Sequence, residues 1–313
     1  MMNGYENIEI YDYEDIVKPY RYYDFGYVFN YKNASFKYSI RFKYLLVITH
    51  VAEILEKDVV TLSDKSEYKN RVLNVLKEIL KGKKFSIELH RIDYKVDIKM
   101  YSQQMLDEYI KQLNKHNSRF HYMKKRYIYG SSIYLTTKTG QLTFNFYDKY
   151  KEQLERKGKY NEKFKYVLRL EIQNRPAKLK AQLKRNNKDK TLDNYYCKEG
   201  MEENYFDLLS KYLYEGGDYY RIGKAKRIIN SSRNSSKNWK KKLKKFLEAV
   251  DKNGTVQVTY KNKYCCEDTG KVYIEKLNKL GINPITLDNI SSYNKLDNLV
   301  KIARDIAKNQ YYK

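Results

Sequence analysis

The feature that most constrains the fold is a strict alternation of apolar and polar residues in three segments. These segments are HRIDYKVDI at 90–98, LTFNFYD at 142–148 and VLRLEIQ at 167–173. Because successive side chains of a strand point to opposite faces of a sheet, each segment is predicted to be a strand with one apolar and one polar face. This pattern is typical of an antiparallel sheet that packs one face on a core.

Other segments show either the same period of two residues or the helical period. Strands are predicted within 22–48, 85–100, 131–138, 141–148, 165–174 and 254–260. Helices are predicted at 65–82, 102–116, 238–250, 272–280 and 292–309. The predicted class is α+β: a mainly antiparallel sheet with helices on one face, followed by a mostly helical C-terminal region. A polar stretch at 183–194 places the expected domain boundary, between 1–185 and 186–313.

The charge of the chain indicates its partner. Lysine and arginine number 63 against 38 acidic residues, which gives a formal net charge of +25. Such an excess attracts polyanions, so nucleic acid is the favoured partner. No apolar run approaches the roughly 20 residues that span a membrane, and the first residues do not resemble a secretion signal. We therefore expect a soluble cytoplasmic protein with no membrane partner.

The polar faces of the three alternating segments carry the candidate site. They comprise Arg91, Asp93, Lys95, Asp97, Asn145, Tyr147, Arg169, Glu171 and Gln173. If the strands pair in one sheet, this face gathers carboxylates, arginines and a tyrosine. Carboxylates suit Mg²⁺ or Mn²⁺, arginines bind phosphates, and a tyrosine can form a covalent intermediate. The alternative is the ordinary polar face of a half-buried sheet.

These residues also carry a resemblance to a family. HRIDYKVDI, a helix, SIYLTTKTGQLTFNFYDKYKE and LRLEIQ follow one another over about 85–175. In this order they resemble the core of rolling-circle replication initiators, both the trans-acting plasmid proteins and the gene II/gene X proteins of phages. The resemblance implies a catalytic domain related in fold and chemistry to HUH endonucleases. The chain lacks the His-hydrophobe-His pair of those enzymes, as do the trans-acting plasmid initiators.

The resemblance implies roles for individual residues. Tyr147 falls on the position of the nucleophile, and Asp93 and Glu171 on acidic positions where Mg²⁺ or Mn²⁺ ligands are expected. Asp97, on the same polar face, is a further candidate ligand. Lys149 would favour the phenolate unless it is a solvated surface lysine.

Three further residues complete this set of candidates. Arg169, like Arg91, would hold neighbouring phosphates. His90 is a candidate third metal ligand, although its phase with Ile92 favours a core histidine.

The implied activity is the nicking of origin DNA. Attack by the tyrosine gives a 5′-phosphotyrosyl link and a 3′-hydroxyl that primes synthesis. Residues 1–185 would form the nicking domain, and 186–313 a DNA-binding or accessory region. The helix at 238–250 either contacts DNA or packs on the core with its lysines in water.

The expected partners are origin DNA, single-stranded or hairpin at the nick and duplex for recognition, with a host helicase and polymerase by resemblance. Two alternatives stay open, a non-catalytic DNA-binding regulator and a metal-dependent nuclease that uses water.

Overall fold

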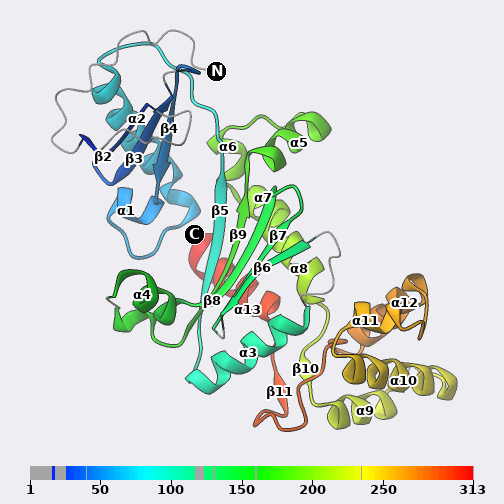
Figure 1. Cartoon of the computed structure of the whole chain (residues 1–313). Helices are drawn as coiled ribbons and strands as arrows, with labels where there is room; N and C mark the ends of the chain where they lie inside the picture. The colour runs from blue at the N-terminus through cyan, green and yellow to red at the C-terminus, as the bar shows by residue number, and fades with distance from the viewer. Residues whose placement is uncertain are drawn as a thin grey trace. The chain divides into compact units, whose positions relative to one another are not determined.

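A computed structural model describes residues 16–17, 26–39, 41–116, 123–129, 131–158, 161–233 and 235–312. The chain is α+β with antiparallel sheets, as predicted, and a helical C-terminal region follows the strands (Figure 1). It divides into two compact units. The small unit comprises 1–89, 189–198 and 308–313, and the large unit comprises 90–188 and 199–307.

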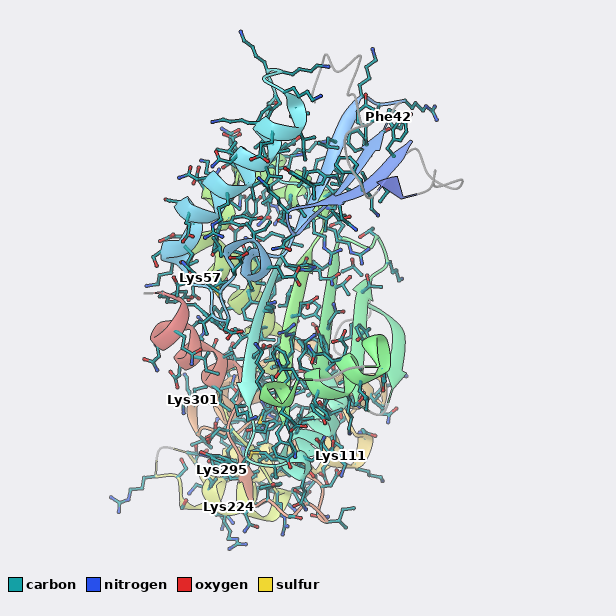
Figure 2. All side chains as sticks on the ribbon, turned by 90° about the vertical axis from the view of Figure 1, so that its left-hand side faces the viewer. Phe42, Lys57, Lys111, Lys224, Lys295 and Lys301 are labelled. Atoms are coloured by element: carbon teal, nitrogen blue, oxygen red, sulfur yellow. The ribbon has the colours of Figure 1, made fainter. Side chains whose placement is uncertain are left out.

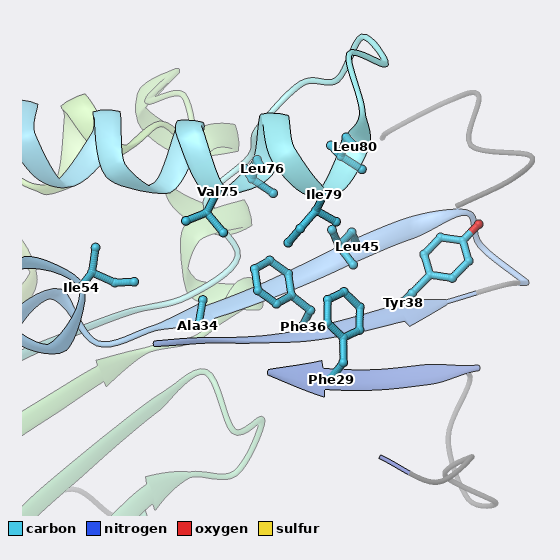
Figure 3. Packing of buried hydrophobic residues seen from close by; sticks show 10 residues of the cluster. All are labelled: Phe29, Ala34, Phe36, Tyr38, Leu45, Ile54, Val75, Leu76, Ile79 and Leu80. Atoms are coloured by element: carbon cyan, nitrogen blue, oxygen red, sulfur yellow. The ribbon is translucent and has the colours of Figure 1, made fainter. Parts of the chain in front are cut away.

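The small unit is built on a four-stranded antiparallel sheet covered by a helix. Its elements are β1 (Ile16–Val17), β2 (Tyr27–Tyr31), β3 (Ala34–Ser39), β4 (Tyr44–Thr49), α1 (Val51–Leu55), a 3₁₀ turn (Leu62–Asp64), α2 (Lys65–Leu80) and α6 (Leu192–Tyr195). Phe29 and Phe36 stack with ring centres 5.0 Å apart, under the apolar face of α2 (Figure 3). The predictions of strands within 22–48 and of a helix ending near Gly82 are confirmed.

The large unit contains the three alternating segments in one five-stranded sheet. Its strands are β5 (Ile92–Lys99), β6 (Met123–Tyr129), β7 (Ser132–Thr137), β8 (Leu142–Asp148) and β9 (Val167–Asn174). Their order is β5-β9-β8-β7-β6, and every neighbouring pair is antiparallel (Figure 1). The hairpin predicted at Gly140 joins β7 to β8. Strand β6 was not predicted, and the strand predicted from residue 85 begins only at Ile92.

Helices cover the apolar face of this sheet. The remaining elements are α3 (Gln103–His116), α4 (Lys149–Lys157), a 3₁₀ turn (Glu162–Phe164), α5 (Pro176–Asn186), α7 (Lys198–Met201), a π turn (Glu202–Phe206), α8 (Asp207–Leu213), β10 (Tyr219–Tyr220), α9 (Ile222–Ser231), α10 (Lys237–Asn253), α11 (Val256–Lys261), α12 (Glu267–Lys279), β11 (Lys295–Leu296), α13 (Leu299–Ile306) and a second π turn (Ala307–Tyr311). Tyr212 of α8 stacks on Phe144 of β8 at 5.3 Å between ring centres. The hydroxyl of Tyr205 donates to the carbonyl oxygen of Leu170 at 2.9 Å.

The expected boundary between 185 and 186 coincides with none of the four points at which the chain passes between the compact units, 89/90, 188/189, 198/199 and 307/308. Residues on both sides of it share one core, because the apolar face of the sheet needs the helices that follow residue 199 to exclude water. The polar stretch at 183–194 leads into 189–198, a segment of the small unit, after which the chain returns to the large unit.

The strand predicted at 254–260 is wrong, because these residues form helix α11. The side chain of Thr255 accepts a hydrogen bond from the backbone N–H of Val258 at 3.1 Å and so caps the helix. Val256 and Thr259 are buried three residues apart, which is helical spacing. Packing has therefore overridden the strand preference of an alternating, β-branched segment.

The core of the large unit makes a stability prediction. Phe146 is fully buried on the apolar face of β8, so Phe146→Ala should lower the free energy of unfolding by about 3–5 kcal/mol. Tyr101 is 93% exposed, and Tyr101→Ala should change it by less than about 0.5 kcal/mol. Urea denaturation of both variants measures the difference. Equal losses would contradict the packing described for the sheet.

Candidate active site

The polar faces of β5, β9 and β8 meet as predicted, with β9 in the centre. In the sheet register, Glu171 lies opposite Lys95 on one side and Asn145 on the other. Arg169 lies in the same way between Asp97 and Tyr147. The alternation in the sequence therefore identified correctly which residues share this face.

Tyr147 is held at the junction between β8 and α4. The next residue, Asp148, is fully buried and caps α4, since its carboxylate accepts from the backbone N–H of Tyr150 at 3.0 Å and of Lys151 at 3.1 Å. Gln103 of α3 donates to the same carboxylate at 3.0 Å. These bonds fix the point where strand changes to helix, and with it the direction of the Tyr147 side chain.

The carboxylate of Glu171 is the centre of a hydrogen-bond network. It accepts from Asn145 Nδ2 at 2.9 Å and from Gln173 Nε2 at 2.7 Å. The hydroxyl of Tyr147 donates to its other oxygen at 3.4 Å, which is a long and weak bond. The amides hold Glu171 in place, and its second oxygen faces the phenol.

Burial controls the protonation of Tyr147. The side chain is 6% exposed, and its ring stacks on that of Tyr134 at 6.2 Å between centres. Burial, followed by the negative charge of Glu171, raises the pKa of Tyr147 well above its ordinary value, and Arg169 opposes this shift. The phenol is therefore protonated at neutral pH, so any reaction through its oxygen requires a proton acceptor.

Two arginine–aspartate pairs flank this network. Arg169 binds Asp97 through two hydrogen bonds of 2.6 Å, and its side chain is 10% exposed. Arg91 binds Asp93 through bonds of 2.8 and 2.5 Å, but its side chain is 43% exposed. The first pair is fixed inside the face, whereas the second lies at its open edge.

Lys149 does not project freely into solvent. Its Nζ lies 5.6 Å from the centre of the Tyr147 ring and makes an ion pair of 2.6 Å with Glu152. The lysine thus covers the tyrosine ring, and its side chain is 13% exposed. The alternative of a solvated surface lysine is wrong.

Two of the three predicted carboxylates are candidates for holding a divalent cation. Within the described ranges, no group of three or more His, Cys, Asp or Glu side chains converges on one point. Asp97 does not fit, because the buried Arg169 occupies both of its oxygens.

Asp93 and Glu171 are the two carboxylates left as candidate ligands. Arg91 binds both oxygens of Asp93 as well, but its side chain is 43% exposed, whereas that of Arg169 is 10% exposed. The two carboxylates are close enough that Glu171 contributes to raising the pKa of Asp93, an effect for which burial is the main cause. These two carboxylates suit Mg²⁺, which commonly takes one or two carboxylates and completes its shell with water and substrate phosphates.

The predicted histidine, His90, does not lie in the core. His90 precedes β5 and is exposed, so its prediction as a core histidine is wrong. Among the residues that the structure describes, a buried histidine is His116 of α3, which packs among the rings of Tyr212, Tyr214 and Tyr219. Its helical spacing from Leu113 was a signal for burial.

Asn145 and Gln173, which orient Glu171, were placed on the polar face by the sequence but given no role. The signal that was available for them is their position: Asn145 lies opposite Glu171, and Gln173 lies two residues along the same strand.

Comparisons of the chain with protein-family models, with curated proteins and with solved structures found no match. No helix in the part of the chain that the structure describes is both long enough and apolar enough to cross a bilayer.

Proposed function

We propose that the protein is a rolling-circle replication initiator that nicks origin DNA with Tyr147. One observation carries the proposal: the hydroxyl of Tyr147 donates to the carboxylate of Glu171 on a sheet face that also holds Arg169. A tyrosine, a proton acceptor and a cation are the groups that covalent attack on a phosphodiester requires. The net charge of +25 favours DNA as the substrate.

The proposed reaction begins with the transfer of the phenolic proton to Glu171. The phenolate oxygen then attacks the scissile phosphorus, a tyrosine–phosphate bond forms, and the bond from phosphorus to the 3′ oxygen breaks. The departing 3′ oxygen takes the proton and becomes the primer. The phosphodiester energy is retained in the new ester, so the strand can be rejoined without ATP.

Arg169 and Lys149 have separate roles in the proposed reaction. Arg169 already opposes the rise in the pKa of Tyr147, so its guanidinium stabilises the anion and not a distant phosphate. Lys149 lies over the tyrosine ring, and we propose that it moves onto the incoming phosphate. This movement uncovers a nucleophile that is otherwise 6% exposed.

Asp93 and Glu171 would hold the Mg²⁺ or Mn²⁺ ion. The ion would polarise the scissile phosphate. Arg91, at the open edge of the face, is placed to bind an adjacent phosphate when Asp93 takes the metal. We place the initiator in the cytoplasm with origin DNA, and by resemblance with a host helicase and polymerase.

A denaturing gel after incubation with single-stranded DNA from the origin and Mg²⁺ tests the proposal. We expect a covalent protein–DNA band together with a cleaved fragment that ends in a 3′-hydroxyl. Cleaved DNA without a covalent band would instead identify a nuclease that uses water. Intact DNA that is bound by the protein would identify a regulator.

A further inference from the structure

A second site lies at the start of α9 and contains none of the residues discussed above. It is a pocket of about 340 Å³. Its lining consists of Arg221, Gly223, Lys224, Arg227, Asn289 and Asn294. Every side chain in this lining is a cation or an amide, and Gly223 leaves the backbone open.

The fold brings these residues together from two distant parts of the chain. Strand β10 pairs with β11, which places residue 294 beside residue 221, and Arg221 N–H donates to the carbonyl of Asn294 at 3.4 Å. Leu287 N–H donates to the carbonyl of Tyr220 at 3.0 Å, which brings the segment containing Asn289 to the same place. Arg221, Lys224 and Arg227 follow at helical spacing on one face of α9. Backbone hydrogen bonds thus hold the segments that line the pocket together.

The cations of the pocket have no acidic partner among the described residues. Arg221, Lys224 and Arg227 make no ion pair there, whereas the neighbouring Lys226 pairs with Glu248 at 2.6 Å. The acids nearest to the pocket residues along the chain are already paired: Asp218 with Lys295 at 2.9 Å and Asp288 with Lys115 at 2.6 Å. The Nε of Arg221 is buried and donates no hydrogen bond within the described structure. A buried donor without an acceptor is costly, so a bound ligand that supplies an acceptor is favoured.

The lining selects the class of ligand. Three cations and two amides without a carboxylate suit a phosphate, and no aliphatic or aromatic side chain is present to hold a base or a sugar. Lys224 lies on the surface of this part of the chain (Figure 2). Helix α10 packs on α9, where Lys240 donates to the carbonyl of Asn230 at 2.8 Å, and exposes further lysines at 237, 241, 242 and 245.

We propose that this pocket binds a backbone phosphate of duplex DNA, with the lysines of α10 contacting the phosphates that follow. The inference rests on DNA being the partner in the proposed function, but it does not require that Tyr147 nicks. It assigns contacts with duplex DNA to α9 as well as to α10.

The test measures how the affinity for duplex DNA of unrelated sequence depends on salt, with the full chain carrying Tyr147→Phe. Lys224→Gln and Arg227→Gln should each reduce the slope of log affinity against log salt by about one, and should weaken binding about tenfold at about 0.1 M salt. Lys226→Gln, on the same helix but paired with Glu248, should leave the slope unchanged. Thermal denaturation checks that all three variants are folded.

Competition with inorganic phosphate distinguishes a DNA phosphate from a free one. Phosphate at millimolar concentration should not displace the duplex, because a phosphate ion in the pocket would replace only one of many contacts between the protein and the DNA. Displacement with unchanged slopes would overturn the assignment to DNA and leave a site for small anions. Unchanged slopes in both pocket variants without any effect of phosphate would overturn the site itself. Nicking by the chain with Tyr147 intact is scored separately, so failure of one proposal does not imply failure of the other.

Discussion

Tyr147→Phe is expected to abolish nicking and covalent capture of origin DNA while changing DNA affinity by less than about twofold. The substitution removes one hydroxyl that donates a long hydrogen bond of 3.4 Å to Glu171. The ring and its stacking on Tyr134 are kept. Removal of a nucleophile that acts as a unit with its base leaves only background reaction, so the expected loss is at least about 10⁴-fold. Gel quantification of nicking and a filter-binding isotherm measure the two effects.

Tyr150→Phe provides the matched control. Tyr150 lies three residues further on in α4, and its hydroxyl donates to Glu162 at 3.2 Å instead of to the carboxylates of the sheet. This variant should nick at nearly the normal rate. A Tyr147→Phe protein that still traps DNA, or a Tyr150→Phe protein that does not, would move the nucleophile to another tyrosine.

The part of the structure that follows from side-chain alternation was predicted well. A period of two residues fixes which side chains share a face, and it placed Tyr147, Arg169 and Glu171 together without knowledge of the strand order. The same rule failed at 254–260, where alternating residues form α11 because Val256 and Thr259 are buried at helical spacing. Alternation over a few residues predicts a strand only where a neighbouring strand is present to pair with it.

The pairing of charges across the face was not predictable from the sequence. The acids and cations of β5 and β9 can combine in several ways, and the choice of Asp97 for Arg169 depends on the register of two strands separated by more than 60 residues. This choice removes Asp97 from the metal ligands. The ion pair of Lys149 with Glu152 was not predicted either, although a spacing of three residues on a helix is one at which side chains meet.

The second large effect is expected at Glu171. A glutamine keeps the shape and one carbonyl oxygen for Asn145 and Gln173, but it cannot accept the phenolic proton of Tyr147 or contribute charge to a metal. Glu171→Gln should therefore lower the nicking rate by about 10²–10⁴-fold, the range of a general base. Single-turnover nicking at saturating Mg²⁺ measures this loss separately from DNA binding.

Combining Glu171→Gln with Asp93→Asn tests whether the two carboxylates serve one metal ion. Asp93→Asn alone should raise the Mg²⁺ concentration needed for half-maximal nicking, since one of two ligands is lost. In the double variant the two losses should be far from additive, because either change already disables the same unit. Asp97→Asn is the control, because its carboxylate is bound by Arg169 at 2.6 Å. This variant should slow nicking by disturbing Arg169, which stabilises the Tyr147 phenolate, without changing the Mg²⁺ concentration needed for half-maximal nicking. Additive losses for Asp93 and Glu171, or a midpoint that moves equally for Asp97, would contradict a shared site formed by that pair.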